Sequence, residues 1–441
     1  LDVTDENITA DFEDPDIDNN FPYQIGTTSS YVWTSPGSNT VNFDWLSATD
    51  LPDADGVYCL RLTANDGIAD QSVSATTTIY IDNLEPSAPG NLSLNTKNTY
   101  DLVLEFGGES TENNFSEYKM FYKGGTSGVI ETDTEHIDSN LGDRLYNSAA
   151  TTTIFNLNTG TDYVFNIYAY DDYGNKSNAI EQSFTTNYIP GSPTNFSQKK
   201  NDNLTVVSNG SWTDENNVYL SAEVNDEDVS EVLSLYYEIR PVAEGFLTAT
   251  SAPINPCLEG ESYGTCTDKV WKASSVSGDY SVSPFVGAGN LSDIPDSSTG
   301  YKWQALACDD NDVCSAWGDI GTNPNFKIDT IDPGIPGNLS LDSQNYNSVT
   351  LNFAASSSEA NFREYIIYYK EGGSGVTEND NMHASTSDIN LFAQNYNSAV
   401  GTTINGLLEN TEYVVNIYAY DEVGRVSNAT ELVVTTNDRP L

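Results

Sequence analysis

Leu157-Asn158-Thr159-Gly160-Thr161-Asp162-Tyr163 runs almost directly into the alternating stretch Asn166-Ile167-Tyr168-Ala169-Tyr170-Asp171. The second stretch recurs residue for residue as Asn416-Ile417-Tyr418-Ala419-Tyr420-Asp421, and Leu407 again precedes Tyr413 by six residues. A tyrosine that follows a leucine by six residues and opens a strand has the spacing of a tyrosine corner, in which the hydroxyl returns to the upstream backbone. The two stretches therefore predict a pair of related β-sandwich domains.

Internal repetition extends over the whole chain. Pro89-Gly90-Asn91-Leu92-Ser93-Leu94 recurs as Pro336-Gly337-Asn338-Leu339-Ser340-Leu341, and Thr4-Asp5-Glu6-Asn7 recurs as Thr213-Asp214-Glu215-Asn216. A repeat at domain spacing decides the architecture before any local feature does. The predicted order is domain A (residues 1–85), domain B (86–187), domain A′ (188–332, with an insertion around 250–298) and domain B′ (333–441).

Short alternating strands, separated by turns of Gly, Asn, Asp and Ser, dominate all four segments. No apolar period of 3.6 residues is sustained anywhere, so long amphipathic helices are not expected. The predicted fold class is all-β, with four tandem β-sandwich domains.

Domains B and B′ resemble fibronectin type III modules, through the Leu157-to-Tyr163 stretch and the strand that ends in Ala169-Tyr170-Asp171. The tryptophan that is common on an early strand of that family is replaced by Phe106 and Phe353, which predicts a different core packing. Domains A and A′ resemble bacterial Ig-like surface modules, through Tyr301-x-Trp303-x-Ala305 and an Ile-Asp-Thr exit strand at 328–330.

The charge of the chain excludes several classes of partner. Its 65 Asp and Glu against 17 Lys and Arg give a formal net charge of −48. Such a charge repels nucleic acid and anionic membranes, and the sequence has no long apolar run for membrane insertion. It also destabilises compact states by self-repulsion, so bound cations are expected, with calcium the usual extracellular candidate.

Calcium is expected at the domain junctions. In an Ig-type sandwich the B–C and F–G loops emerge at one end, beside the incoming linker, and acidic residues gather in these loops and linkers. A solvated acidic loop without an ion is the alternative. The candidate ligands are Asp14, Asp16, Asp18, Asp66, Asp70, Asp82 and Glu85 in domain A, Asp171 and Asp172 in B, Asp226, Asp228, Asp309, Asp310, Asp312, Asp329 and Asp332 in A′, and Asp421 in B′.

Five cysteines indicate the redox compartment. Cys257 and Cys266 bracket a loop, Cys308 and Cys314 bracket a predicted hairpin, and neither pair has the spacing of a zinc site. Both pairs are predicted to form disulfides in an oxidising, extracellular or cell-surface location. Cys59 is predicted to be an unpaired thiol.

Nothing in the sequence points to catalysis. No nucleophile elbow, phosphate-binding loop or His-Glu-x-x-His sequence occurs, and carboxylate pairs are unavoidable among so many acids. The only histidines, His136 and His383, occupy similar places in the two B copies and are interpreted as surface loop residues. The chain is predicted not to be an enzyme.

Domain A′ has a strand-like Leu204-Thr205-Val206-Val207 before Thr213, whereas domain A has only three residues before Thr4. One interpretation is an excerpt of a longer repeat protein. The other is a filament subunit whose sandwich is completed by a strand from its neighbour.

The predicted function is a structural or adhesive segment of an extracellular stalk or fibre, with Pro86 and Pro333 stiffening the linkers and neighbouring copies or flanking repeats as partners. An alternative is a carbohydrate- or protein-binding module array. In that case the insertion around Cys257, Trp271 and Tyr280 would present aromatic side chains to a ligand. A third is the accessory region of a secreted enzyme.

Overall fold

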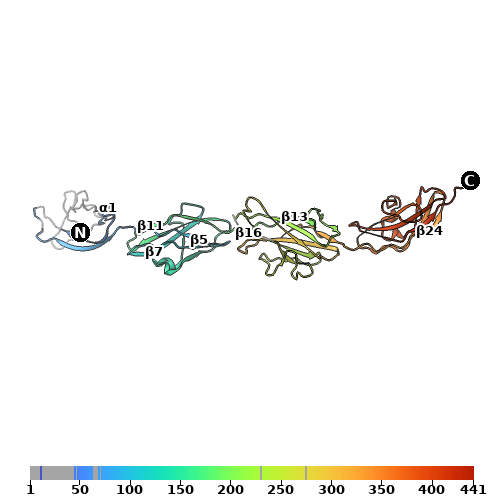
Figure 1. Ribbon diagram of the computed structural model, residues 1–441. Coiled ribbons are helices and arrows are strands. Elements are labelled where there is room, and N and C mark those ends of the chain that lie inside the picture. Colours follow the sequence, from blue (N-terminus) through green and yellow to red (C-terminus); the bar gives the residue numbers. More distant parts are fainter. Residues whose placement is uncertain are drawn as a thin grey trace. The chain divides into compact units, whose positions relative to one another are not determined.

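A computed structural model describes residues 10–11, 44–45, 47–62, 68–69, 71–228, 231–273 and 276–441 (Figure 1). The chain divides into two compact units, residues 1–187 and 188–441. The described residues form strands, one four-residue helix (α1, Ser47–Asp50) and four short 3-10 turns. None of the helices in these ranges has the length and hydropathy to cross a membrane. The all-β prediction, with sandwiches in tandem, is confirmed.

The first unit contains the described part of domain A. Strands β1 (Ala10–Asp11) and β2 (Asp44–Trp45) pair antiparallel, as do β3 (Asp55–Leu62) and β4 (Ala75–Asp82). Strand β4 ends in the buried Ile81 and Asp82, which lead into the linker to domain B.

Domain B is a sandwich of two antiparallel sheets. The first sheet contains β5 (Ser93–Lys97), β6 (Leu102–Glu105) and β9 (Thr151–Ile154). The second contains β8 (Thr134–His136), β7 (Phe115–Gly124), β10 (Asp162–Asp171), β11 (Lys176–Asn178) and β12 (Gln182–Thr185), of which β11 and β12 both pair with β10.

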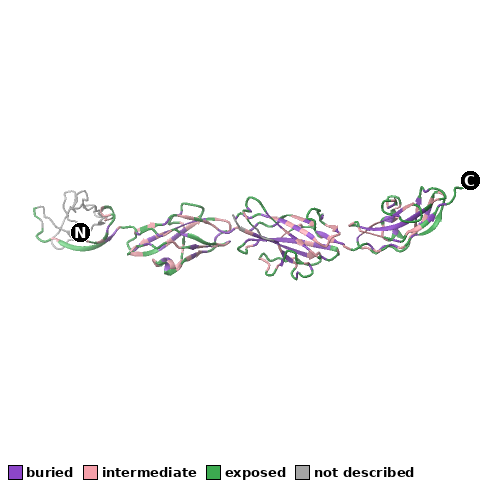
Figure 2. Cartoon of the chain, viewed as in Figure 1, coloured by how far each residue is buried: buried purple, intermediate pink, exposed green. Residues whose placement is uncertain are grey.

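The core of domain B lies between these sheets. Successive side chains of a strand point to opposite faces, and Leu102, Leu104, Phe165 and Ile167 are the alternate residues that face inward. Figure 2 shows the buried residues along the central strands of domains B, A′ and B′. The alternating sequence pattern therefore places the apolar side chains between the two sheets, where they are buried.

Domain B′ repeats this arrangement strand for strand. Its first sheet contains β24 (Ser340–Gln344), β25 (Ser348–Asn352) and β28 (Gly401–Asn405). Its second contains β27 (Asn381–His383), β26 (Phe362–Glu371), β29 (Glu412–Asp421), β30 (Val426–Asn428) and β31 (Leu432–Thr435).

Three stacked aromatic rings fill the position where a tryptophan is common. Phe106 stacks on Tyr146 with ring centroids 4.2 Å apart, and Tyr146 stacks on Tyr118 at 4.5 Å. Phe353, Tyr396 and Tyr365 form the same stack in domain B′, at 4.1 and 4.5 Å. In both modules the phenylalanine at this position is therefore one ring of a three-ring aromatic stack.

The middle ring of each stack is held by an unusual turn. Tyr146, Asn147 and Ser148 all have positive φ (52°, 54° and 61°), and the same holds at Tyr396, Asn397 and Ser398 (53°, 51° and 62°). Left-handed backbone is disfavoured for residues with a Cβ, so packing must hold it in place. The buried tyrosine ring between two aromatic neighbours supplies that packing in both copies.

The predicted tyrosine corners are present. The hydroxyl of Tyr163 accepts a hydrogen bond from the backbone N–H of Asn158 at 3.0 Å, and that of Tyr413 accepts one from Leu408 at 2.9 Å. Each bond joins the start of a long central strand to the chain that precedes it. The Leu-to-Tyr spacing therefore predicted this feature of the sandwich correctly.

Domain A′ is a larger sandwich. Its smaller sheet contains β13 (Thr194–Lys200), β15 (Val218–Val224) and β20 (Phe285–Leu291). Its larger sheet contains β14 (Ser211–Thr213), β23 (Phe326–Ile328), β21 (Ser297–Cys308), β16 (Glu231–Pro241), β18 (Val270–Lys272), β17 (Cys257–Leu258), β19 (Val276–Gly278) and β22 (Gly318–Asp319). The fully buried Trp303 and Tyr237 lie at the centre of its core, with Trp303 Nε1 donating to Gln198 Oε1 at 3.0 Å.

Candidate functional sites at the domain junctions

The first junction, between domains A and B, is closed by two asparagine side chains. Asp82 Oδ2, at the end of β4, accepts from Asn114 Nδ2 at 2.9 Å. Asn175 Nδ2 donates both to the backbone oxygen of Asp82 at 3.0 Å and to Asp171 Oδ2 at 2.7 Å. The remaining Asp82 oxygen, Oδ1, accepts from Leu84 N at 3.2 Å. Every carboxylate oxygen that this junction buries therefore has a donor.

Asp171 also shapes the turn that carries Asn175. Its Oδ1 accepts from the backbone N–H groups of Tyr173 and Asn175, both at 2.9 Å, which closes the turn between β10 and β11. On the same turn, the Tyr173 ring stacks on Tyr80 of β4 at 5.5 Å. The turn is thus fixed within domain B and pressed against domain A.

The second junction, between A′ and B′, has the same frame. Asp421 Oδ1 accepts from Val423 N at 2.9 Å and Arg425 N at 2.8 Å, and Asp329 Oδ1 accepts from Ile331 N at 3.1 Å. Asp329 and Asp421 therefore stand where Asp82 and Asp171 stand in the first unit.

The second junction differs in one donor. The position of Asn175 is taken by Arg425, whose guanidinium donates to Asp332 Oδ1 at 3.2 Å and to the backbone oxygen of Asp214 at 3.1 Å. Burial raises the pKa of the Asp421 carboxyl, and the neighbouring Asp329 carboxylate raises it further. The arginine joins the two domains but does not neutralise these two acids.

Comparison with known proteins identifies two of the domains that meet at these junctions, B and B′. A family model described as "Fibronectin type III domain" matches residues 87–184 and 334–435. Domains B and B′ are fibronectin type III-like modules. No curated protein matches the sequence.

Among solved structures, the chain is similar to "Crystal structure of chicken CNTN1 FN1-FN3 domains", at 14% identity and a TM-score of 0.27. The match covers 80% of this chain and 99% of that chain. The TM-score is too low to carry an argument about how the modules are arranged.

The structure distributes the predicted calcium ligands unevenly. In A′, Asp228 Oδ2 accepts from Tyr188 N at 2.8 Å, Asp226 Oδ1 accepts from Asp228 N at 3.0 Å, and Asp309 Oδ1 accepts from Asn311 N at 2.9 Å. Five other candidates, at the linkers and loop tips, are exposed to solvent: Glu85, Asp172, Asp310, Asp312 and Asp332. Asp14, Asp16, Asp18, Asp66 and Asp70 lie outside the described residues.

Within the described ranges, no three His, Cys, Asp or Glu side chains lie together in a group that could hold a metal ion. Calcium binding at the junctions therefore stays a prediction. The same is true of the incomplete first strand of domain A, because residues 1–9 are not among those that the structure describes.

Both predicted disulfides are present in A′. The Cα atoms are 5.7 Å apart in Cys257–Cys266 and 4.1 Å apart in Cys308–Cys314. Cys59, on β3 of domain A, is an exposed free thiol. The spacing argument therefore gave the right pairs.

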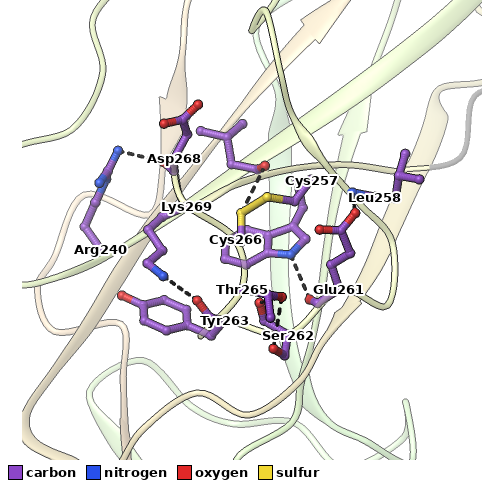
Figure 3. Close-up of a disulfide and its surroundings, with 12 residues drawn as sticks. Arg240, Cys257, Leu258, Glu261, Ser262, Tyr263, Thr265, Cys266, Asp268 and Lys269 are labelled. Carbon is purple, nitrogen blue, oxygen red and sulfur yellow. Dashed lines mark hydrogen bonds between the residues drawn. A yellow bond between two sulfur atoms is a disulfide. The ribbon is translucent and has the colours of Figure 1, made fainter.

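The structure does not support the alternative in which Trp271 presents its ring to a ligand. Its side chain is only 2% exposed, and its Nε1 donates to the backbone oxygen of Glu261 at 3.0 Å. The rings of Tyr263 and Trp271 stack with their centroids 6.0 Å apart. Figure 3 shows Tyr263 on the loop that the Cys257–Cys266 disulfide closes. Tyr280 is also buried, against Phe285. The disulfide loop covers Trp271, and both aromatic side chains belong to the core of A′.

The histidine interpretation also needs correction. His383 lies on β27 and is buried, with its Nε2 hydrogen-bonded to Thr402 Oγ1 at 2.7 Å. His136 makes the same contact with Thr152 at 2.7 Å. Burial lowers the pKa of both imidazoles. They are polar parts of the sandwich interior and not surface loop residues.

Sequence reasoning missed Asn114, Asn175 and Asn361, because asparagine is abundant throughout the chain. It also missed Arg425. An alignment of Asp171-Asp172-Tyr173-Gly174-Asn175 with Asp421-Glu422-Val423-Gly424-Arg425 contains the signal. The two copies keep the acid and the glycine of the turn and differ in the last residue, whose side chain hydrogen-bonds to the neighbouring domain in both.

Proposed function

We propose that the chain is a non-catalytic spacer segment of an extracellular stalk or fibre, in which tandem sandwiches hold whatever lies at their ends at a set separation. The observation that carries this proposal is the pair of junctions. In each of them a side chain at the end of the same turn, Asn175 or Arg425, donates to the backbone of the preceding domain. Contacts of this kind resist hinge motion, which a spacer requires and a loosely linked binding array does not.

Three further observations support it. Two disulfides in A′ fit an oxidising compartment outside the cell. The net charge of −48 keeps copies of the chain from associating indiscriminately. The aromatic side chains that were expected to meet a ligand, Trp271 and Tyr280, are used in the core of A′. Flanking repeats or further copies of the protein are the partners that such a segment would have.

Stretching single molecules of the full chain tests the proposal. A spacer built of independently folded sandwiches should unfold in discrete steps, and its stability should be a sum over domains and junctions. Asn175→Ala, which removes the tie between domains A and B, should leave these steps in place but allow the linker to extend before the first one. A chain that lengthens smoothly under low force, without discrete unfolding steps, would contradict the proposed role as a spacer.

A further inference from the structure

Three buried oxygen atoms at the second junction have no hydrogen-bond partner. They are Asp329 Oδ2, Asp421 Oδ2 and Asn361 Oδ1. The three residues are 7%, 0% and 5% exposed, so water does not replace the missing donors freely. Buried polar atoms are almost always paired in folded proteins, and an unpaired buried carboxylate oxygen is the costliest case.

Two observations relate these residues to Asp421. The Asp329 carboxylate is close enough to Asp421 to raise its pKa, although burial is the larger cause. The backbone oxygen of Asn361 accepts from the N–H of Glu422 at 2.9 Å, which places it beside the residue after Asp421. Asn361 thus lies beside the chain at Asp421, as Asn114 lies beside Asp171 through the equivalent bond from Asp172 N at 2.8 Å.

The first junction shows how the same acids are satisfied when donors are present. There, Asn114 Nδ2 donates to Asp82 Oδ2 at 2.9 Å, and Asn175 Nδ2 donates to Asp171 Oδ2 at 2.7 Å. At the second junction neither bond is made, and the Nδ2 of Asn361, which corresponds to Asn114, is buried without an acceptor. Arg425 has replaced the second asparagine and directs its guanidinium to Asp332 and Asp214 instead. Two negative charges are left facing each other in a buried place.

We propose that the second junction is a calcium site and the first is not. Asp329 Oδ2, Asp421 Oδ2 and Asn361 Oδ1 would supply oxygen ligands from both domains, and water or backbone oxygens would complete the roughly six to eight that calcium takes. Calcium accepts carboxylate and amide oxygens in a variable geometry, whereas magnesium demands a near-ideal octahedron. The ion would do at A′–B′ what two asparagine amides do at A–B. This inference does not depend on the spacer role.

Calorimetric titration of the full chain with calcium chloride, at physiological ionic strength to suppress diffuse binding, tests the site. The key variant is Arg425→Asn, which gives the second junction the donor of the first. It should bind calcium at this site at least about tenfold more weakly than the wild type, the size of effect seen when groups around a metal site are altered. Electrostatics alone predicts the opposite, because the substitution removes a positive charge.

Two charge-matched variants complete the experiment. Asp421→Asn should remove one bound calcium ion per chain, whereas Asp171→Asn, the same charge change at the first junction, should leave the stoichiometry unchanged. Any calcium bound elsewhere in this acidic chain is bound by all variants alike, so it does not contribute to the difference between them. Equal calcium binding by the wild type, Arg425→Asn and Asp421→Asn would overturn the proposal, as would a wild type that binds magnesium at this site and not calcium. A pair of carboxylates that share a proton would give the first of these results.

Discussion

The two junctions of this chain begin with the same acids and end with different chemistry. Asp82 and Asp171 at A–B correspond to Asp329 and Asp421 at A′–B′, and in both cases the second acid uses one oxygen to close a turn. The first junction satisfies its other oxygens with Asn114 and Asn175. The second leaves Asp329 Oδ2 and Asp421 Oδ2 buried without a donor.

The interiors of the two fibronectin type III-like modules have not diverged in this way. Phe106, Tyr146 and Tyr118 form a stack that Phe353, Tyr396 and Tyr365 reproduce, with centroid distances that agree within 0.1 Å for Phe–Tyr, 4.2 against 4.1 Å. Close packing constrains every atom of a core, whereas a junction can be closed by any group that satisfies its buried carboxylate oxygens. A duplicated domain can therefore keep its core and change how it joins its neighbour.

The largest expected effect tests whether the cores are in fact equivalent. Tyr118→Ala and Tyr365→Ala each remove the last ring of the aromatic stack. Each also removes a hydroxyl that accepts from a backbone N–H, that of Ser110 at 2.8 Å or Ser357 at 2.7 Å. Each should lower the free energy of unfolding of its own module by about 3–5 kcal/mol. Hydrogen exchange resolved by peptide in the full chain measures both, and a loss in one module much smaller than in the other would break the comparison.

A smaller effect separates the junctions. Asn114→Ala leaves Asp82 Oδ2 buried without its donor and should cost about 1–3 kcal/mol. Asn361→Ala, measured in a chelator, should cost less than this, because neither its Oδ1 nor its Nδ2 has a partner to lose. Chemical denaturation of both variants, followed by exchange at the junction peptides, gives the difference. Equal costs in the chelator would mean that Asn361 already closes the second junction as Asn114 closes the first.

The smallest effect is a dependence on pH. The folded pKa of Asp421 is raised, so the folded chain binds a proton more readily than the unfolded chain does. Without calcium, the second junction should gain stability as the pH falls from neutral through the folded pKa of Asp421 toward the ordinary value of an aspartate. Thermal unfolding against pH in a chelator should show this gain, and Asp421→Asn should abolish it. A wild type that only loses stability over that range, in step with the variant, would contradict the assignment.

The sequence was sufficient for the features that repeat with a fixed spacing. Leu157 and Tyr163 predicted the tyrosine corner, the alternation along 166–171 predicted a central strand, and the positions of four cysteines predicted both disulfides. Each of these depends on contacts close in the sequence or on the strand period itself. Features of these two kinds can be recognised in a single sequence.

The side chains that were misjudged or missed depend on contacts distant in the sequence. The alternative in which Trp271 meets a ligand fails because the Cys257–Cys266 loop packs on the ring, which is only 2% exposed. Asn175 was overlooked because its partner, the backbone of Asp82, is far away along the chain. No local pattern distinguishes an asparagine that closes a junction from one that only caps a turn.

The central claim is that the two junctions are closed by different groups, amides in one and a cation in the other. Hydrogen exchange of the full wild-type chain, in calcium and in a chelator, measures it directly at residues 82–85 and 329–332. We expect calcium to slow exchange at residues 329–332 and to leave residues 82–85 unchanged. Equal protection of both segments in the two conditions, or a calcium response at residues 82–85 as large as that at 329–332, would contradict the claim.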